Sequence, residues 1–172
     1  ALDLIQRITT NDASKLTNGK AQYSCLPNND GGIVDDLLVY CIEEQKVYML
    51  VVNASNMEKD WNWIKSHNTE NVEMLDISDK TALLAVQGPD AVRAMQKLTD
   101  LDLVNLKYYT FVKGTFAGID NVVISATGYT GAGGVEIYFP SEDSAMAAAV
   151  WHKIMEAGKE FNIKPCGLGC RD

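Results

Sequence analysis

The chain has 172 residues, of which 47% are hydrophobic and 22% are charged, a composition typical of a globular protein with a substantial core. Its formal net charge of -8 argues against a nucleic-acid surface, because phosphate binding requires clustered lysine and arginine. No apolar run approaches the roughly 20 residues that cross a bilayer, and the opening ALDLIQRITTND lacks the pattern of a signal peptide, so no membrane partner is expected.

The first half of the chain predicts a short helix, three strands and a second helix. Apolar residues between positions 2 and 8 are spaced for one helical face. The extended runs AQYSCLP, IVDDLLVYCI and VYMLVV are separated by the polar turns NNDGG and EEQK, which predicts antiparallel strands joined by tight turns. Residues Asn53–His67 predict a helix, with Ser55 as its N-cap and Glu58 three residues later.

The second half of the chain has strand patterns in five places. They are Val72–Ile77, Ala82–Val86, Tyr108–Phe116, Asn121–Ala126 and the run VEIYFP. Pro89 is expected in the first turn of a helix, where its missing N–H costs nothing. A last helix is predicted from near Ser141 to about Gly158. Strands grouped in hairpins and mixed with helices predict an α+β fold with antiparallel sheets.

Two adjacent aspartates, Asp35 and Asp36, interrupt the apolar strand GGIVDDLLVY. Successive side chains of a strand face opposite sides, so one carboxylate is expected to meet solvent while the other turns toward whatever covers the opposite face. Alternatively, the strand begins just after a turn and both aspartates lie at its wet end. Periodicity does not decide between these interpretations, or which aspartate is functional.

The stretch TGYTGAGGVEIY, from Thr127 to Tyr138, places four glycines in one short loop before a strand. Such a loop lets backbone N–H groups approach a ligand closely. It lacks a following GK[ST] and the GxGxxG spacing, which argues against a nucleotide-phosphate loop. Standing alone, it is interpreted as a glycine-rich hairpin loop in which Glu136 is an exposed strand carboxylate.

The four cysteines fall at no zinc-finger or CxxC spacing, and neither histidine has a second type of metal ligand nearby in the sequence. We therefore expect no metal site. Reduced thiols in a cytoplasmic protein are the better interpretation of these cysteines.

Seven stretches of the chain form an ordered set: ITTND, GKAQYS, NDGGIVDDLLVY, VVNASNMEKDWNWI, ALLAVQGP, TGYTGAGGVEI and PCGLGCRD. Taken in this order, they resemble the T protein family, the aminomethyltransferases of the glycine cleavage system. Each motif is weak alone, but the ordered set is specific. The resemblance implies that residues 1–172 are a folate-binding region from the central portion of such a protein, without its N-terminal segment and its C-terminal barrel domain. The implied fold is a ferredoxin-like α+β lobe with part of its neighbour, incomplete at both ends.

The resemblance also implies an activity. T proteins transfer a methylene group from the aminomethyl-dihydrolipoyl arm of the H protein to tetrahydrofolate, with release of ammonia. Tetrahydrofolate is therefore the expected co-substrate and the H protein the expected partner. A folate channel built between lobes needs walls from all of them, so we expect the piece alone to fold and to be inactive.

The family's motifs imply roles for particular residues. The second aspartate of GGIxDD is the catalytic carboxylate, here Asp36, which suits a cationic, iminium-like state. Glu136 is the implied pterin anchor, because a carboxylate accepts paired N–H groups. Further folate-channel residues implied by the motifs are Tyr23, Tyr40, Asn53, Asn56, Tyr129 and Arg171. The family usually has GYTGE where this chain has GYTGA with Ala132, so the loop has lost a carboxylate but not the anchor.

Related proteins on the same scaffold give the alternatives. One is the folate domain of a sarcosine or dimethylglycine dehydrogenase, or a related demethylase. Another is a folate-binding iron–sulfur assembly factor, whose KGCYxGQE signature is absent from this sequence. A non-catalytic folate-binding or interaction module is the third.

Overall fold

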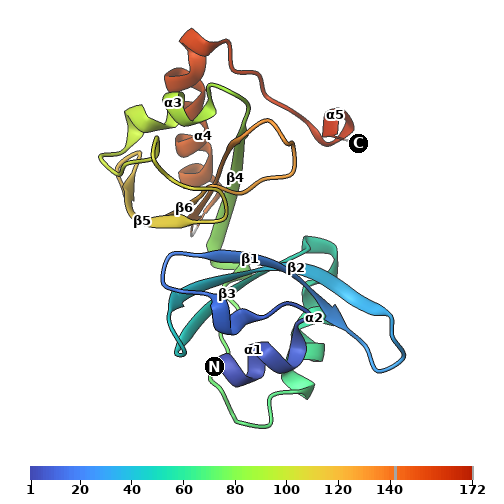
Figure 1. Ribbon diagram of the computed structural model, residues 1–172. Helices are drawn as coiled ribbons and strands as arrows, with labels where there is room; N and C mark the ends of the chain where they lie inside the picture. The colour runs from blue at the N-terminus through green and yellow to red at the C-terminus, as the bar shows by residue number, and fades with distance from the viewer. Residues whose placement is uncertain (142, 172) are drawn as a thin grey trace. The chain divides into compact units, whose positions relative to one another are not determined.

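A computed structural model describes residues 1–141 and 143–171, and the chain divides into two units, Ala1–Leu75 and Asp76–Asp172. Each unit has its own antiparallel sheet and its own helices (Figure 1). The predicted α+β class with antiparallel sheets is therefore confirmed. Among the described residues, no helix combines the length and apolar character that crossing a membrane requires.

The first unit is a three-stranded sheet with helices packed against one face. Its elements are α1 (Leu2–Ile8), β1 (Ala21–Pro27), β2 (Ile33–Glu43), β3 (Val47–Val52) and α2 (Met57–Ser66), with strand order β1-β2-β3. The buried face of α1 meets alternate residues of β2 and the inner side of α2. This core contains Leu4, Ile5, Ile8, Leu26, Leu37, Val39, Cys41 and Ile64. The predicted first helix and three strands are confirmed.

The alternation of β2 separates the two adjacent aspartates. Leu37, Val39 and Cys41 are buried in the core, and Asp35 lies in phase with them at 9% exposure. Asp36 points to the opposite face and is half-buried. The interpretation that the two carboxylates face opposite sides is thus confirmed, and the interpretation that both lie at a wet strand end is wrong.

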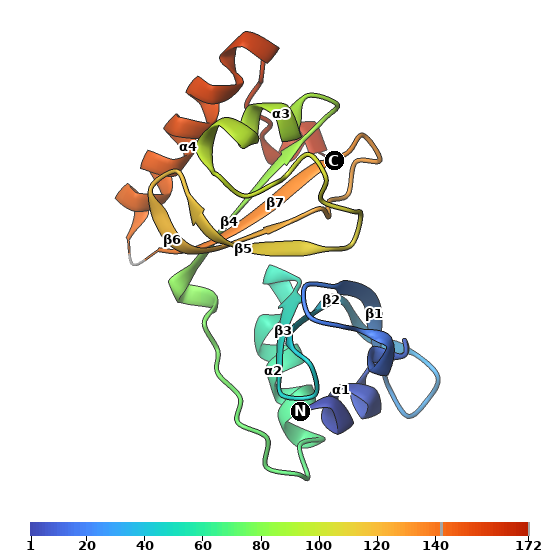
Figure 2. The ribbon, with the colours of Figure 1, turned by 60° about the vertical axis from the view of Figure 1, so that its left-hand side comes forward.

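The second unit is a four-stranded sheet with strand order β4-β7-β6-β5. Its elements are β4 (Thr81–Gln87), α3 (Ala91–Met95), β5 (Phe111–Phe116), β6 (Ile119–Ser125), β7 (Gly134–Pro140), α4 (Ser144–Gly158) and α5 (Leu168–Arg171). Helices α3 and α4 cover one face, where Met95, Val150 and Ile154 meet β7 residues such as Ile137 (Figure 2). The order β-α-β-β-β-α has a strand where the ferredoxin-like order β-α-β-β-α-β has its second helix.

Three local predictions are wrong. Ser55 lies in a 3-10 turn, and α2 begins one step later with Asn56 as an N-cap that makes no side-chain capping bond. Val72–Ile77 forms no strand, because it crosses the boundary between the units and has no strand beside it. Pro89 lies in the turn before Asp90, the N-cap of α3, rather than in the first helical turn. The last helix begins at Ser144, close to the predicted position, with Asp143 accepting a bond from the Met146 N–H.

Candidate functional site

The Asp36 carboxylate is held by two donors that come from neighbouring strands. The Tyr23 hydroxyl on β1 donates to Asp36 Oδ2 over 2.7 Å. The Asn53 side-chain amide, directly after β3, donates to Asp36 Oδ1 over 2.8 Å. The hydrogen bond to Asp36 holds the pKa of the Tyr23 hydroxyl above its usual value, because the neutral phenol is the donor. The carboxylate is therefore oriented at both oxygens while its face of the sheet stays partly accessible.

The same amide connects Asp36 to Asp35. Asn53 Nδ2 also donates to Asp35 Oδ1 over 3.0 Å. Burial acts to raise the pKa of Asp35, but the polar side chains of Asp60, Asn56 and Asn53 outweigh it and hold this pKa below its usual value. Asp35 is therefore an ionised carboxylate at neutral pH although it is almost fully buried.

A third carboxyl group, Asp60 on α2, was not found by the sequence analysis. Its side chain is fully buried at 0% exposure, beneath the strand that carries Asp35. Burial, followed by the contact with Asp35, raises the pKa of Asp60 to about 7. The available signal was its spacing, because Asp60 precedes the buried Ile64 by one helical turn and so lies on the inner face of α2.

Glu136 on β7 is the centre of a separate polar group in the second unit. Its Oε2 accepts hydrogen bonds from the hydroxyl of Thr127 and, over 3.1 Å, from the hydroxyl of Tyr138. The Thr127 hydroxyl also lies 3.0 Å from the Ser125 hydroxyl. Ser125 and Thr127 are buried while Glu136 is half-buried. The Glu136 carboxylate is therefore partly accessible to solvent and is supported from below by buried hydroxyl groups.

The glycine-rich loop that precedes β7 borders an open hollow of about 400 Å³. The hollow is lined by Gln87, Val92, Leu103, Leu106, Tyr108, Ala126, Thr127, Gly128, Gly131, Gly133, Gly134 and Val135. Thr127 therefore contacts both this hollow and Glu136. The end of the loop lies against the turn that follows β4, because the Gly88 N–H donates to the Gly133 carbonyl over 2.8 Å.

Gly134 is required at the point where this loop enters β7. It has a φ of +132°, and a Cβ there would lie 2.4 Å from the backbone oxygen of Val86. We expect Gly134→Ala to lower the free energy of unfolding by about 2 kcal/mol, because a backbone atom must shift to make room. A urea unfolding curve followed by circular dichroism measures the loss.

Gly133→Ala is the matched control for this prediction. Gly133 also has a positive φ, +76°, but a Cβ there meets nothing within 4 Å. The control should lose only about 1 kcal/mol, the cost of the left-handed conformation alone. Equal losses in the two variants would show that close packing against Val86 contributes nothing.

The other predicted folate residues are distributed unevenly. Asn56 helps to hold the pKa of Asp35 below its usual value and so belongs to the first unit's polar cluster. Tyr40 lies on β2 in phase with Asp36 and is fully buried. Tyr129, at the tip of the glycine-rich loop, is 92% exposed and does not line the hollow beside that loop. Arg171 lies in α5, and its side chain is outside the part of the chain that the structure describes.

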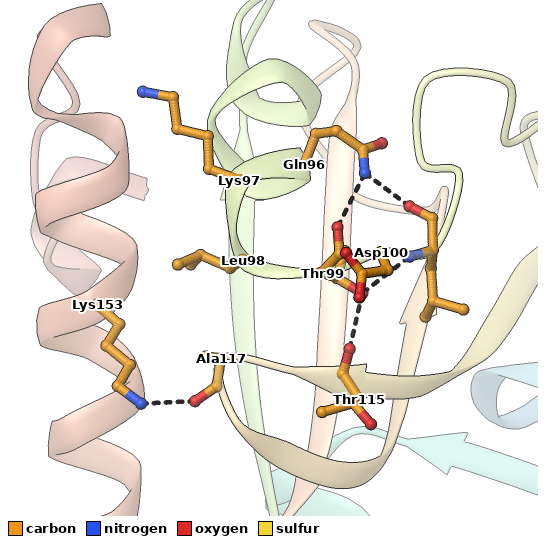
Figure 3. A pocket seen from close by; sticks show the side chains of 9 residues that line it. Gln96, Lys97, Leu98, Thr99, Asp100, Thr115, Ala117 and Lys153 are labelled. Carbon is orange, nitrogen blue, oxygen red and sulfur yellow. Dashed lines mark hydrogen bonds between the residues drawn. The ribbon is translucent and has the colours of Figure 1, made fainter.

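A larger hollow of about 800 Å³ in the second unit is lined by none of the predicted site residues whose side chains the structure describes. It is lined by Gln96, Lys97, Leu98, Thr99, Asp100, Leu101, Thr115, Ala117 and Lys153 (Figure 3). Two of its polar side chains bind backbone carbonyls of the same unit. The Gln96 amide donates to the carbonyls of Thr99 and Leu101, and Lys153 donates to the carbonyl of Ala117. We therefore assign the chemistry to the carboxylate clusters and not to this hollow.

The family assignment follows from a comparison with known protein families. The model of the GCVT N-terminal domain matches residues 1–172. The chain belongs to this family. It is also similar in structure to the glycine cleavage system aminomethyltransferase T from Bartonella henselae, with a TM-score of 0.79 and 26% identity over 99% of this chain and 44% of that one.

Two curated relatives of this GCVT domain are named aminomethyltransferase. An aminomethyltransferase of Flavobacterium psychrophilum is 64% identical over the whole chain, which covers 47% of that relative. An aminomethyltransferase of Bacteroides thetaiotaomicron is 59% identical, again over the whole chain and 46% of the relative. The chain thus spans about half the length of the curated relatives that it matches.

Proposed function

We propose that this GCVT domain is the folate-binding catalytic region of a glycine cleavage aminomethyltransferase. The reaction transfers a methylene group from the aminomethyl-dihydrolipoyl arm of the H protein to tetrahydrofolate and releases ammonia. The observation that carries the proposal is the 64% identity, over every residue of the chain, with a protein named aminomethyltransferase. Four free cysteines also fit a reducing compartment, so we place the protein in the cytoplasm.

In this proposal Asp36 is the catalytic carboxylate. As ammonia leaves, the aminomethyl carbon becomes iminium-like and cationic, and a nearby negative charge stabilises it. The bonds from Tyr23 and Asn53 hold both carboxylate oxygens before substrate arrives, so little reorientation is needed during the reaction. The half-buried position of Asp36 leaves the carboxylate open to a ligand.

Glu136 is proposed as the group that orients the pterin. A carboxylate accepts the two parallel N–H groups of the 2-amino and N3 edge. Glu136 Oε2 already accepts from two hydroxyls, so one of them should turn away when the pterin binds. Thr127 is suited to this, because its single hydroxyl proton has a second acceptor within 3.0 Å in Ser125.

A donor comparison tests the function. We would join this chain to the remainder of the Flavobacterium psychrophilum relative in place of the matching segment, and we call this protein the chimera. Aminomethylated H protein, sarcosine and dimethylglycine are each offered with tetrahydrofolate, and the methylene-tetrahydrofolate formed is measured. Product formed from the H protein donor, but not from sarcosine or dimethylglycine, supports the proposal. Product from sarcosine or dimethylglycine instead favours a demethylase, and folate binding without any product favours a non-catalytic module.

A further inference from the structure

The buried carboxyl group of Asp60 has no role in the mechanism described above. Both of its oxygens and Asp35 Oδ2 are buried without an N–H or O–H donor among the described residues. Asp60 has 0% exposure and Asp35 has 9%, so neither is solvated to any extent. Two ionised carboxylates in contact at such a position are strongly unfavourable.

One proton between the two carboxyl groups removes this conflict. A contact between carboxyl groups is a hydrogen bond only when one of them is protonated. Burial and the contact with Asp35 raise the pKa of Asp60 to about 7, while the pKa of Asp35 is held below its usual value. The proton therefore belongs to Asp60, and Asp35 is the charged acceptor.

The charged Asp35 connects this proton to the proposed catalytic group. Asn53 Nδ2 carries two hydrogens and lies 3.0 Å from Asp35 Oδ1 and 2.8 Å from Asp36 Oδ1. One N–H can thus serve each carboxylate. The bond to Asp35 fixes the orientation of the Asn53 amide. The same amide then fixes the position of the Asp36 carboxylate through its second N–H.

We propose that Asp60 is a positioning residue whose carboxylic acid donates a hydrogen bond to Asp35. Through Asp35 it orients the Asn53 amide, and the amide in turn orients the Asp36 carboxylate. The proposal rests on the proposed function for the catalytic role of Asp36. The hydrogen-bonded series from α2 to β2 does not depend on any substrate.

The hydrogen bonds that link Asp60, Asp35 and Asn53 should break as Asp60 ionises. The charged groups that act on Asp60 are Asp35 and Asp36 on β2, which raise its pKa, and Lys59 on its own helix, which lowers it. Lys59 is engaged with the carbonyl of Val34 over 2.7 Å. Above pH 7 the two buried carboxylates repel each other, and Asn53 loses its fixed acceptor.

The pH dependence of stability follows with a definite sign. The pKa of Asp60 is raised in the folded state, so its contribution to stability is fully present below the unfolded pKa, near 3.8, and is lost as the pH rises through about 7. Asp60→Asn keeps an N–H donor for Asp35 at every pH. The variant should therefore lose less of its free energy of unfolding between pH 5 and pH 8 than the wild type does.

Nuclear magnetic resonance of the ligand-free 172-residue chain tests the proposal. In the wild type, the Asp60 carboxyl carbon and the Asn53 side-chain amide signals should shift together, with one midpoint near pH 7. In Asp60→Asn the Asn53 signals should stay near their low-pH positions up to pH 8. The control Glu58→Gln, at an exposed position on α2, should keep the wild-type transition.

The wild-type titration decides the matter even where a variant fails to fold. An Asp60 midpoint below pH 5, or Asn53 signals that ignore the Asp60 transition, would overturn the proposal. In the chimera, kcat should fall several-fold between pH 7 and pH 8.5 for the wild type and remain level for Asp60→Asn. If the chimera is inactive with every donor, the proposed function is contradicted. The titration of the ligand-free chain still tests the role of Asp60, because it does not depend on activity.

Discussion

Replacing Asp36 by Asn in the chimera is expected to lower the rate constant of aminomethyl transfer by a factor on the order of 100 or more. The substitution removes the negative charge that stabilises the cationic intermediate, while an amide of the same shape keeps its place between Tyr23 and Asn53. Affinity for tetrahydrofolate should stay within a few-fold. Single-turnover transfer from aminomethylated H protein gives the rate constant, and calorimetric titration gives the affinity.

Asp35→Asn is the matched control, because it removes a neighbouring charge on the same strand. Asp35 points into the core of its unit, and its side chain is linked to the Asp36 carboxylate through the Asn53 amide. We therefore expect a clearly smaller loss of rate. Equal losses, or a larger loss at Asp35, would show that the wrong aspartate has been assigned the catalytic role.

Glu136→Ala is expected to weaken tetrahydrofolate binding on the order of 100-fold. Two hydrogen bonds to a charged group, each worth about 1.5 kcal/mol or more, are lost in the ground state and in the transition state alike. The substitution should therefore raise Kd with little change in the rate constant at saturating folate. Calorimetric titration of the chimera with tetrahydrofolate measures the first quantity, and single-turnover kinetics measures the second.

Glu156→Ala controls for the loss of a carboxylate from the same unit. Glu156 is an exposed residue on α4, the helix that packs on the sheet from the side of Met95 and Ile137. Its removal should leave affinity unchanged. If Glu136→Ala bound folate normally but turned over slowly, the role of pterin anchor would be wrong.

The sequence predicted most of the first unit because its strands are half-buried and show a clear period of two. Alternation in β2 correctly indicated that Asp35 and Asp36 face opposite sides. It did not say which one faces the core, since that depends on which side α1 and α2 cover. The short distances from Asp36 to Tyr23 and Asn53 likewise depend on the register of three strands.

Predictions failed where an isolated pattern lacked its tertiary partner. Val72–Ile77 has the residues of a strand, but the segment passes from one unit to the other without a strand beside it. Asp60 was missed because a carboxylate on a helix is normally solvated, whereas this one lies on the buried face of α2 with Ile64. Ser55 matched a capping box, yet a 3-10 turn delays the start of α2.

The assignment of an aminomethyltransferase is tested by ammonia release from aminomethylated H protein by the chimera, measured with and without tetrahydrofolate. We expect rapid release that requires both the H protein arm and tetrahydrofolate, with one methylene-tetrahydrofolate formed for each ammonia. Release at the same rate without tetrahydrofolate, or no release although the chimera is folded and binds folate, would contradict the assignment of an aminomethyltransferase.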